Sequence, residues 1–267
     1  MFQMNLCKIC HSVKTKLKFV YKSKPKGETD FNIEKKKYYR EFFECCECGH
    51  MFSDPEFEIS NFYEGSYTNK TYGLNLLEKF NKIISLPFNE SDNEGRFQFL
   101  KKKCKKILNS NIINVLDVGS GLGIFPWRVK KENWNITALD PDPQNINHIK
   151  NEIGIKTIQG DFLKVKIPKK YNLITFNKVI EHIKEPKEFI IKAKSIIEDN
   201  SLIYIEVPDV KAAQYGKDRE EFFIEHFHVF SEKSIKLLVN DCGLKCLCAN
   251  SFIEPSGKFT LRVILSN

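Results

Sequence analysis

From residue 112 onward, short apolar runs alternate with segments in which apolar residues recur at helical spacing. The runs predict buried strands at 112–118, 135–139, 155–159, 171–176 and 201–207. The segments between them predict helices at 123–132, 143–152, 186–198 and 231–242. Two further runs predict a closing antiparallel pair at 244–252 and 258–265. Such alternation favours an α/β fold whose mostly parallel sheet is covered by helices on both faces.

The pattern before residue 112 is different. Two β-like stretches, 17–22 and 36–45, flank a polar loop that contains glycine and proline. An aromatic and polar stretch follows, with helical spacing at 74–86 and an amphipathic helix predicted at 95–110. We therefore predict three parts: a small domain at 1–53, a connector at 54–95 and the α/β domain at 96–267.

Nine cysteines are present, and four of them form two C-x2-C pairs in the small domain. The pairs are Cys7 with Cys10 and Cys45 with Cys48. Two such turns supply the four thiolates of a tetrahedral Zn²⁺ site, and four ligands leave no open position for catalysis. We therefore predict that residues 1–53 form a zinc ribbon with a structural metal. Three nearby residues could act as substitute ligands: Cys46, His11 and His50.

Charge and composition narrow the class of protein. The 267 residues are 42% hydrophobic and carry a net charge of +8, which suits an anionic partner. The lysines are scattered, as at 35–37 and 101–106, so most of them are expected to face solvent. No apolar run reaches the ~18–20 residues that span a bilayer, and the first residues lack the apolar core of a secretory signal. We expect a soluble cytoplasmic protein with reduced thiols, and the sequence carries no signal for its oligomeric state.

Three glycines, two residues apart, follow the strand predicted at 112–118: Gly119, Gly121 and Gly123. Without a Cβ atom, the backbone there can turn sharply and approach a ligand. Ligands of wound parallel sheets bind at the carboxyl ends of the strands, which is where this turn lies. The spacing is GxGxG rather than the dinucleotide GxGxxG, so we expect a ligand without a pyrophosphate.

Acidic residues end the next two strands. Asp140 lies 23 residues after Asp117, close to the ~20-residue offset of a carboxylate that accepts both ribose hydroxyls. Its alternative role is the N-cap of the following helix. Asp161 and Phe162 end the third strand. An acid there can accept from an adenine amino group while the ring packs on the purine, although Asp161 could instead form a surface turn.

Together, "VLDVGSGLG", "ALDP", "GDF" and "NKVIEHIKEP" resemble class I S-adenosylmethionine-dependent methyltransferases, over residues 96–267. The resemblance implies a Rossmann-like sheet with the strand order 3-2-1-4-5-7-6. It also implies that S-adenosylmethionine is the cofactor. The cofactor contacts expected on this basis are Asp117, Gly119, Gly121, Gly123, Asp140, Asp161, Phe162 and Asn177.

Two segments offer residues for the methyl transfer itself. "VIEHIKEP" places Glu181 and His182 just beyond the fourth strand. Histidine is the natural base near neutral pH, so His182 is the candidate base and Glu181 would orient it or bind the substrate. The alternative is that both residues hold the loop. In "EHFHVFS", His226 is a candidate substrate contact or a loop histidine that bonds the backbone. His226 and His228 alternate and should share a face on an extended chain, and Ser231 is a predicted N-cap.

The segment "EHFHVFS" and the zinc ribbon resemble the sugar and small-metabolite branch of these methyltransferases. This resemblance implies O-methylation of a nucleotide-activated sugar or another capsule or surface-glycan precursor, which is an anionic small-molecule acceptor. Sugar C-methyltransferases also carry a tyrosine-rich connector, here Tyr63 and Tyr67, but they continue into a long C-terminal domain, whereas this sequence stops at Asn267. C-methylation therefore stays an alternative.

Two rival functions complete the set of hypotheses. A ribosomal-RNA base methyltransferase with a zinc ribbon fits the basic pI of 8.9. However, the 34 residues between the cysteine pairs are many for that family, so nucleic acid is the less favoured partner. The other rival is a non-enzymatic scaffold that keeps the fold, and the intact glycine turn and Asp140 disfavour it.

Overall fold

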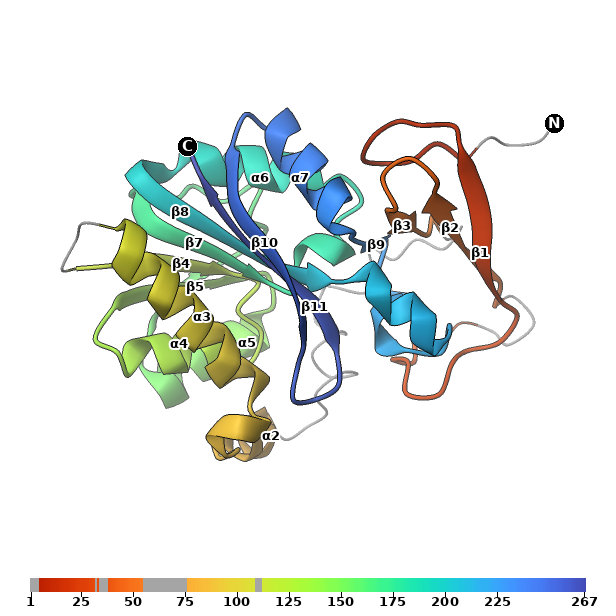
Figure 1. Cartoon of the computed structure of the whole chain (residues 1–267). Coiled ribbons are helices and arrows are strands. Elements are labelled where there is room, and N and C mark those ends of the chain that lie inside the picture. The colour runs from red at the N-terminus through yellow and green to blue at the C-terminus, as the bar shows by residue number, and fades with distance from the viewer. Residues whose placement is uncertain (1–4, 32, 34–37, 55–75, 109–111) are drawn as a thin grey trace.

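Two β-sheets organise the chain, a large one and a small one that lie side by side (Figure 1). The computed structural model describes residues 5–31, 33, 38–54, 76–108 and 112–267. Among these described residues, no helix is both long enough and apolar enough to cross a bilayer. The expected tyrosines of the connector, Tyr63 and Tyr67, lie outside the described residues.

The large sheet has seven strands in the order β10-β11-β8-β7-β4-β5-β6. All neighbours are parallel except β11, which runs antiparallel to both β8 and β10. Counted from β4 as the first strand, this order is 3-2-1-4-5-7-6, so the predicted fold class is confirmed. The strands are β4 (Asn114–Val118), β5 (Asn135–Asp140), β6 (Lys156–Gln159), β7 (Tyr171–Asn177), β8 (Ile197–Pro208), β10 (Lys245–Ile253) and β11 (Phe259–Ser266).

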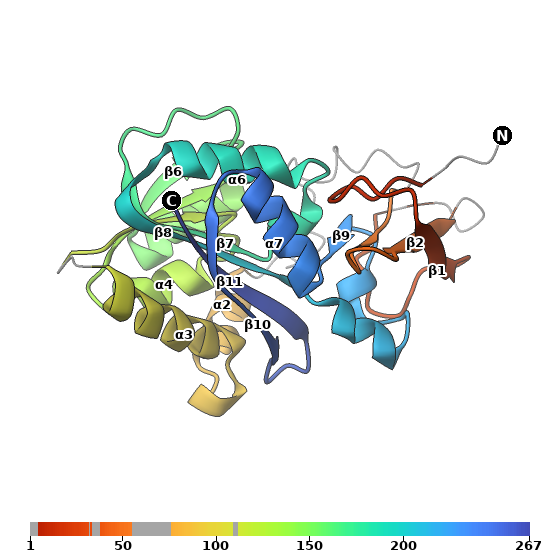
Figure 2. The same cartoon turned by 45° about the horizontal axis from the view of Figure 1, so that its top comes forward.

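Helices cover both faces of this sheet because its strands bury alternate side chains in opposite directions. Along β4, Val115 joins a core with Phe97 and Phe125, whereas Leu116 joins a second core with Phe189. Figures 1 and 2 show α3, α4 and α5 on one face and α6 and α7 on the other. The helices are α2 (Leu76–Ile84), α3 (Asp92–Ile107), α4 (Ile124–Lys130), α5 (Pro143–His148), α6 (Pro186–Ser195) and α7 (Glu232–Asp241).

Side-chain caps fix where several helices begin. Ser91 accepts from the Glu94 amide and starts α3 three residues earlier than the sequence predicted. Ser231 caps α7 in a capping box with Ser234, as predicted. The N-cap of α5 is Asp142. The alternative hypothesis that Asp140 caps this helix is therefore wrong. After α5 a π-helical turn, Ile149–Ile153, completes the stretch predicted as one helix.

The small sheet combines segments that are far apart in the chain. It has the order β1-β2-β3-β9, with β1 (Thr15–Tyr21), β2 (Arg40–Cys45), β3 (Met51–Phe52) and β9 (His228–Val229). The first three strands belong to the cysteine-rich region, whereas β9 follows β8 of the large sheet and pairs with β3 through Phe52 and His228. The two regions therefore share a sheet and an apolar core, which the sequence pattern did not predict.

The predicted domain boundaries stay predictions. The helix that the sequence placed at 95–110 begins at Asp92 and ends at Ile107, so it crosses the expected limit at residue 96. A short 3₁₀ turn (Phe88–Glu90) separates it from α2. Residues 55–75, which make up half of the expected connector, lie outside the described part of the chain.

Candidate active site and metal centre

A cavity of about 1560 Å³ opens at the carboxyl ends of β4, β5, β6 and β7. Ligand pockets usually measure about 300–1,000 Å³, so this one has room for a cofactor and a second molecule. The predicted residues that line it are Asp117, Gly119, Gly121, Asp140, Asp161, Phe162, Asn177, Glu181, His182 and His226. The sheet therefore gathers nearly all the residues that the sequence singled out.

The glycine turn has two parts with different roles. Gly119 has φ +70° and an added Cβ would lie 2.6 Å from Val179 Cγ2, so only glycine fits there. Gly123 has φ +73°, and its Cβ would lie 2.7 Å from side-chain carbons of Ile149 and Ile153. Gly123 is not among the residues that line the cavity. Its missing side chain therefore serves the packing of the π-helical turn, while Gly119 and Gly121 present backbone to the cavity.

Asp140 is held by three hydrogen bonds at the end of β5. Its Oδ2 accepts from the Gly121 amide at 2.8 Å, and its Oδ1 accepts from the Asp142 amide at 2.9 Å and from Asn145 Nδ2 at 3.1 Å. Burial raises the pKa of this carboxyl, and the backbone donors oppose that shift. The bond to Gly121 fixes the carboxylate relative to the glycine turn, so the two features form one rigid wall.

Asp117 and Asn177 form a second fixed group at the ends of β4 and β7. Asp117 Oδ1 accepts from Asn177 Nδ2 at 2.7 Å and from Thr175 Oγ1 at 2.6 Å. Burial raises the pKa of Asp117 to about 6. Among the described residues, the buried Asn177 Oδ1 has no hydrogen-bond partner. An amide oxygen in this state is suited to accept from a donor on a ligand.

Asp161 and Phe162 lie beyond β6. Asp161 Oδ1 accepts from the Leu163 amide at 2.9 Å, and its other oxygen pairs with Lys164 at 3.3 Å. Asp161 thus forms the turn described by the alternative hypothesis and also lines the cavity. Phe162 is buried against Phe176, with ring centroids 5.6 Å apart, so its ring has a fixed place in the wall.

Glu181, His182 and His226 come together at one place, although the two histidines are 44 positions apart in the chain. One potential ligand atom from each residue lies within 4.8 Å of the others. His182 Nδ1 donates to the Glu225 carbonyl at 2.8 Å, and His226 Nδ1 donates to the Glu221 carbonyl at 2.9 Å. Both histidines therefore carry the lone pair on Nε2.

Burial shifts the pKa values of this cluster toward the neutral form of each side chain. Burial raises the pKa of Glu181 to about 8 and lowers the pKa of His182 to about 4. Glu181 is fully buried, and neither carboxylate oxygen has a hydrogen-bond partner among the described residues. A buried carboxylate without a partner is costly and therefore marks a place where a ligand can compensate it.

The expectation that His226 and His228 share a face was wrong. His228 lies in β9, and its Nδ1 meets His50 Nε2 at 3.0 Å. His226 precedes the strand in a turn, and its ring packs on His182 at 4.8 Å. Extended pairing begins only at His228, so the simple alternation of a strand does not reach back to His226.

Part of the cavity wall comes from regions that the sequence did not assign to it. This "ribbon wall" consists of residues 27–30 and 220–226 that line the cavity. Glu28 joins the two segments, because its Oε1 accepts from Arg40 Nη2 at 2.9 Å and from the Ile224 amide at 2.7 Å. The only signal in the sequence was a polar loop between two β-like stretches, which is too common to identify a site.

Arg96 is another residue that the sequence did not identify. It projects from α3 into the lining of the cavity and donates two hydrogen bonds to Glu206, at 2.8 and 2.5 Å. Burial alone would raise the pKa of Glu206, but Arg96 holds it at about 2. The pair joins α3 to the carboxyl-terminal end of β8 (Ile197–Pro208), so it fixes the helix next to the cavity.

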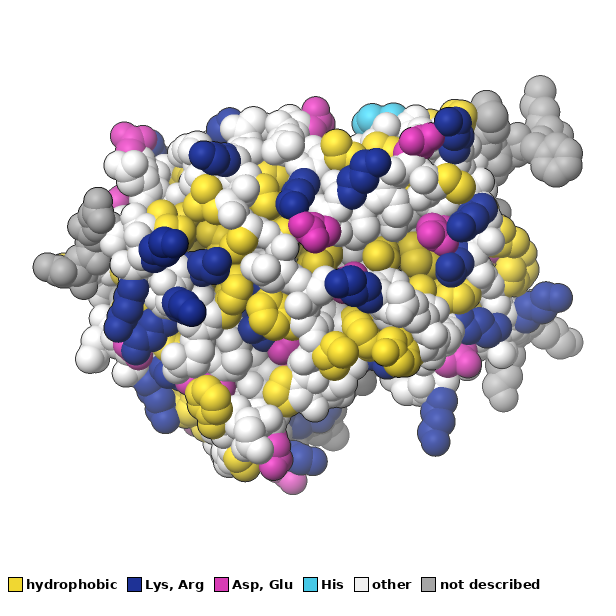
Figure 3. All heavy atoms as spheres, in the orientation of Figure 1, with side chains coloured by type: hydrophobic (Ala, Val, Ile, Leu, Met, Phe, Trp, Pro, Cys, Tyr) yellow, Lys and Arg dark blue, Asp and Glu magenta, His cyan; other side chains and the backbone are white. Residues whose placement is uncertain are grey.

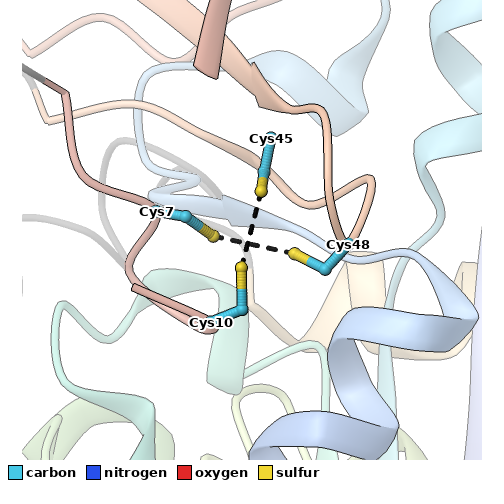
Figure 4. A group of neighbouring side chains, drawn as sticks. All are labelled: Cys7, Cys10, Cys45 and Cys48. Atoms are coloured by element: carbon cyan, nitrogen blue, oxygen red, sulfur yellow. Dashed lines mark hydrogen bonds between the residues drawn. The ribbon is translucent and has the colours of Figure 1, made fainter. Parts of the chain in front are cut away.

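The four predicted cysteine ligands also come together, as Figure 4 shows. Cys7 Sγ lies 3.7 Å from Cys48 Sγ, and Cys10 Sγ lies 3.5 Å from Cys45 Sγ. A hydrogen bond from Cys48 lowers the pKa of Cys7 to about 5. The suggested substitutes are outside this group: His50 bonds His228, and Cys46 is exposed.

Comparison with known proteins identifies the fold. A family model described as a methyltransferase domain matches residues 93–249, more than half of the chain. The chain belongs to this methyltransferase family. The resemblance to class I S-adenosylmethionine-dependent methyltransferases that the sequence motifs suggested is thereby confirmed.

The curated proteins that match this chain have low sequence identity to it. The ubiquinone biosynthesis O-methyltransferase of Rickettsia canadensis (strain McKiel) is 27% identical over 143 residues, 48% of this chain and 61% of that protein. The protein of the same name from Rickettsia bellii (strain OSU 85-389) is 26% identical over 145 residues, 49% of this chain and 60% of that protein. The chain thus spans about three fifths of the length of the curated relatives it matches.

Solved structures share the fold at low identity. Magnesium protoporphyrin IX methyltransferase from Synechocystis PCC 6803, with bound S-adenosylhomocysteine, has a TM-score of 0.57 at 14% identity and covers 76% of this chain and 98% of its own. A methyltransferase from Clostridium acetobutylicum ATCC 824 has a TM-score of 0.54 at 13% identity, with 75% and 98% coverage. At these identities the similarities show the fold alone.

Proposed function

We propose that this protein is an S-adenosylmethionine-dependent O-methyltransferase of a small hydroxyl-bearing molecule. The observation that carries the proposal is one cavity in which the Gly119–Gly121 turn and Asp140 meet the Glu181, His182 and His226 cluster. The family match supports methyl transfer, and the named relatives support an oxygen acceptor.

The residues of the cavity fit the cofactor. S-Adenosylmethionine supplies an activated methyl group on a sulfonium. Asp140 would accept from the ribose hydroxyls, because its carboxylate is already oriented by the Gly121 amide. Asn177 Oδ1 would accept from the amino group of the methionine portion, which gives this buried oxygen the partner that it lacks among the described residues. Phe162 and Asp161 would form the adenine pocket.

The charge of the cavity favours an acceptor without phosphate. Its described lining contains ten carboxylate side chains and four of lysine or arginine. Several of these carboxylates belong to the ribbon wall, where Glu225 keeps a buried oxygen without a partner among the described residues. A nucleotide diphosphate would meet repulsion there. The nucleotide-linked glycan precursor expected from the sequence therefore has no support from the site, nor from the named relatives.

The same argument weakens the RNA alternative. Figure 3 shows several lysine and arginine side chains gathered on the left of the visible face and others scattered among acidic ones, whereas the described lining of the cavity has more carboxylates than cations. Binding of an RNA backbone depends on many cations acting together.

The proton of the acceptor hydroxyl must leave as the oxygen attacks the methyl carbon. The Glu181, His182 and His226 cluster lines the cavity and is the group suited to this task. If no metal ion is bound beside it, His182 accepts this proton on Nε2. Its other ring nitrogen, Nδ1, already donates to the Glu225 carbonyl. The carbon–sulfur bond breaks as the carbon–oxygen bond forms.

We further propose that the four cysteines hold a structural Zn²⁺. With Zn–S bonds of about 2.3 Å, tetrahedral geometry places sulfur atoms ~3.8 Å apart. The sulfur atoms of the pairs Cys7–Cys48 and Cys10–Cys45 lie 3.7 and 3.5 Å apart, so the geometry fits the ion. A site with four thiolate ligands has no open position, so the role of the metal is to hold the ribbon wall in place.

Titration calorimetry with S-adenosylhomocysteine tests the cofactor assignment. Asp140→Ala should weaken binding by about 10- to 100-fold, since hydrogen bonds to a charged group contribute about 1.5–3 kcal/mol. Asp199→Ala, at an exposed position, is the control and should bind like the wild type. Unchanged affinity in Asp140→Ala would contradict the assignment, and no binding of S-adenosylhomocysteine to the wild type would contradict the function.

Transfer of a labelled methyl group tests the acceptor class. Hydroxylated acceptors without phosphate should be labelled, and matched nucleotide-diphosphate sugars should not. Labelling of the nucleotide sugars alone would overturn the argument from the charge of the cavity.

A further inference from the structure

We propose that Glu181, His182 and His226 hold a divalent transition-metal ion in the cavity, at a site separate from the four-cysteine centre. This inference rests on the proposed function and deepens it. One potential ligand atom from each residue lies within 4.8 Å of the others. Two imidazoles and one carboxylate on one side of an ion form the facial arrangement that leaves coordination positions open.

The hydrogen bonds around the histidines are those of metal ligands. A ligating histidine usually donates its second ring N–H to a carbonyl or carboxylate, which fixes the ring and directs the other nitrogen to the metal. His182 donates from Nδ1 to the Glu225 carbonyl at 2.8 Å, and His226 does the same to the Glu221 carbonyl at 2.9 Å. Both acceptors are backbone atoms of the ribbon wall, so the wall orients both rings.

Glu181 supplies an independent observation. Its side chain is fully buried, and both carboxylate oxygens are without a hydrogen-bond partner among the described residues. Two cations of the cavity lining are hydrogen-bonded elsewhere: Arg96 donates two hydrogen bonds to Glu206, and Lys178, whose charge also acts on Glu181, donates to Thr260 Oγ1 at 2.8 Å. A bound cation would neutralise Glu181 and coordinate an oxygen that otherwise has no partner.

The other buried histidine pair shows what a site without a metal looks like. His50 Nε2 bonds His228 Nδ1 at 3.0 Å, and His228 Nε2 faces the Lys184 carbonyl at 3.3 Å. Both nitrogens of His228 are therefore engaged within the protein. No carboxylate joins that pair in the groups of potential ligands found among the described residues.

The ion would give the cavity a direct role in activating the acceptor. An acceptor hydroxyl bound at an open position of the ion would become more acidic, and its proton would leave to solvent water. The resulting oxygen forms the bond to the methyl carbon as the carbon–sulfur bond breaks. His182 then acts as a ligand that positions the ion, and the proton no longer needs to pass to its Nε2.

Mn²⁺ is a suitable probe because it prefers nitrogen and oxygen ligands and competes poorly for thiolates. The experiment uses the full chain with one equivalent of Zn²⁺, which fills only the four-cysteine centre, and follows Mn²⁺ binding by electron paramagnetic resonance. One Mn²⁺ should bind per chain. Since changes around metal ligands alone cost about 10–100-fold in affinity, His226→Ala and Glu181→Gln should each weaken binding at least ~100-fold.

Glu220→Gln is the matched control, because Glu220 lines the same cavity and pairs with Lys258 outside the cluster. It should bind Mn²⁺ as the wild type does. Binding of S-adenosylhomocysteine by each variant shows that it is folded. Absence of stoichiometric Mn²⁺ binding to the wild type, or equal binding by His226→Ala, would overturn the proposal.

The two proposals fail in different ways. If S-adenosylhomocysteine binds and the methyl group is transferred with no Mn²⁺ bound, the metal site is wrong and the methyltransferase function stands. If S-adenosylhomocysteine does not bind, the proposed function is wrong whatever the Mn²⁺ result.

Discussion

Two pairs of histidines lie in contact in this molecule, and they differ in what surrounds them. In the cavity pair, His182 and His226 have ring centroids 4.8 Å apart and line the cavity. In the interface pair, His50 and His228 have ring centroids 5.2 Å apart and lie buried where β3 meets β9. Two members, His226 and His228, are only two residues apart in the chain.

The pKa values do not separate the pairs. Burial lowers the pKa of both His182 and His228 to about 4. Perturbed pKa values occur in structural networks as well as in active sites, so the shift alone is weak support for function. What differs is the surroundings of the pairs: the cavity pair lies beside Glu181 in the lining of the cavity, whereas the interface pair is buried where β3 meets β9. His182 and His226 each give one nitrogen to a backbone carbonyl, whereas His228 engages both nitrogens within the protein.

The largest expected effect that separates the pairs concerns turnover. His182→Ala should lower the rate of methyl transfer by about 10²–10⁴-fold, both if His182 itself accepts the proton and if it holds the ion that makes the acceptor hydroxyl more acidic. The free energy of unfolding should change by about 1 kcal/mol or less, because the ring already borders the cavity. Steady-state kinetics and thermal unfolding of the same preparation measure both quantities.

This result would be contradicted by full turnover in His182→Ala. A fall in turnover that is matched by loss of S-adenosylhomocysteine binding would also contradict it, because the residues proposed to hold the cofactor are Asp140 and the glycine turn rather than His182. Binding of S-adenosylhomocysteine therefore serves as the internal control.

The large sheet was predictable because its signals are local. Each buried strand is a short apolar run, and the strand order followed from a resemblance carried by a few motifs. The ends of elements moved by a few residues where a cap or a tight turn decided them, as at Ser91 and at the π-helical turn after α5. Asp140 was predictable for the same reason, since it directly follows a recognisable strand.

The ribbon wall was not predictable, because it depends on contacts between distant segments. Glu28 bonds the Ile224 amide 196 residues away, and β9 contributes only two residues to a sheet begun near the N-terminus. Neither has a periodic pattern of its own. His50 was considered as a metal ligand because of its place near Cys48, yet its partner is His228, 178 residues later.

The second effect should appear in stability. His228→Ala leaves His50 Nε2 without its partner and opens space between β3 and β9, so the free energy of unfolding should fall by about 2–4 kcal/mol. Turnover per folded molecule should stay within a few-fold of the wild type. Denaturant unfolding followed by tryptophan fluorescence measures the change.

A loss of turnover without a loss of stability in His228→Ala would contradict this prediction. If His228→Ala keeps its stability and loses turnover, then the interface pair takes part in the reaction and the distinction between the two pairs is wrong. His148→Ala, which removes a buried histidine on the other face of the sheet, is a control for the loss of one buried ring.

The smallest effect tests how the interface pair is held. Ser231 lies three residues after His228. Its Oγ accepts from the Ser234 amide as the N-cap of α7 and donates to the Cys48 carbonyl at 2.5 Å. Ser231 therefore links α7 to the cysteine-rich region. Ser231→Ala should lower the free energy of unfolding by about 1–2 kcal/mol, the upper range for a lost cap. Denaturant unfolding measures this change as well.

Ser195→Ala is the matched control for the lost cap, because it removes an exposed hydroxyl at the end of α6 and should change the free energy of unfolding by less than ~0.5 kcal/mol. Since the Cys48 carbonyl also loses a donor in Ser231→Ala, release of Zn²⁺ to a chelator should be faster in that variant than in Ser195→Ala. Equal rates and equal stabilities in these two variants would show that the cysteine-rich region is held by its apolar core alone, and that the interface histidines do not depend on this link.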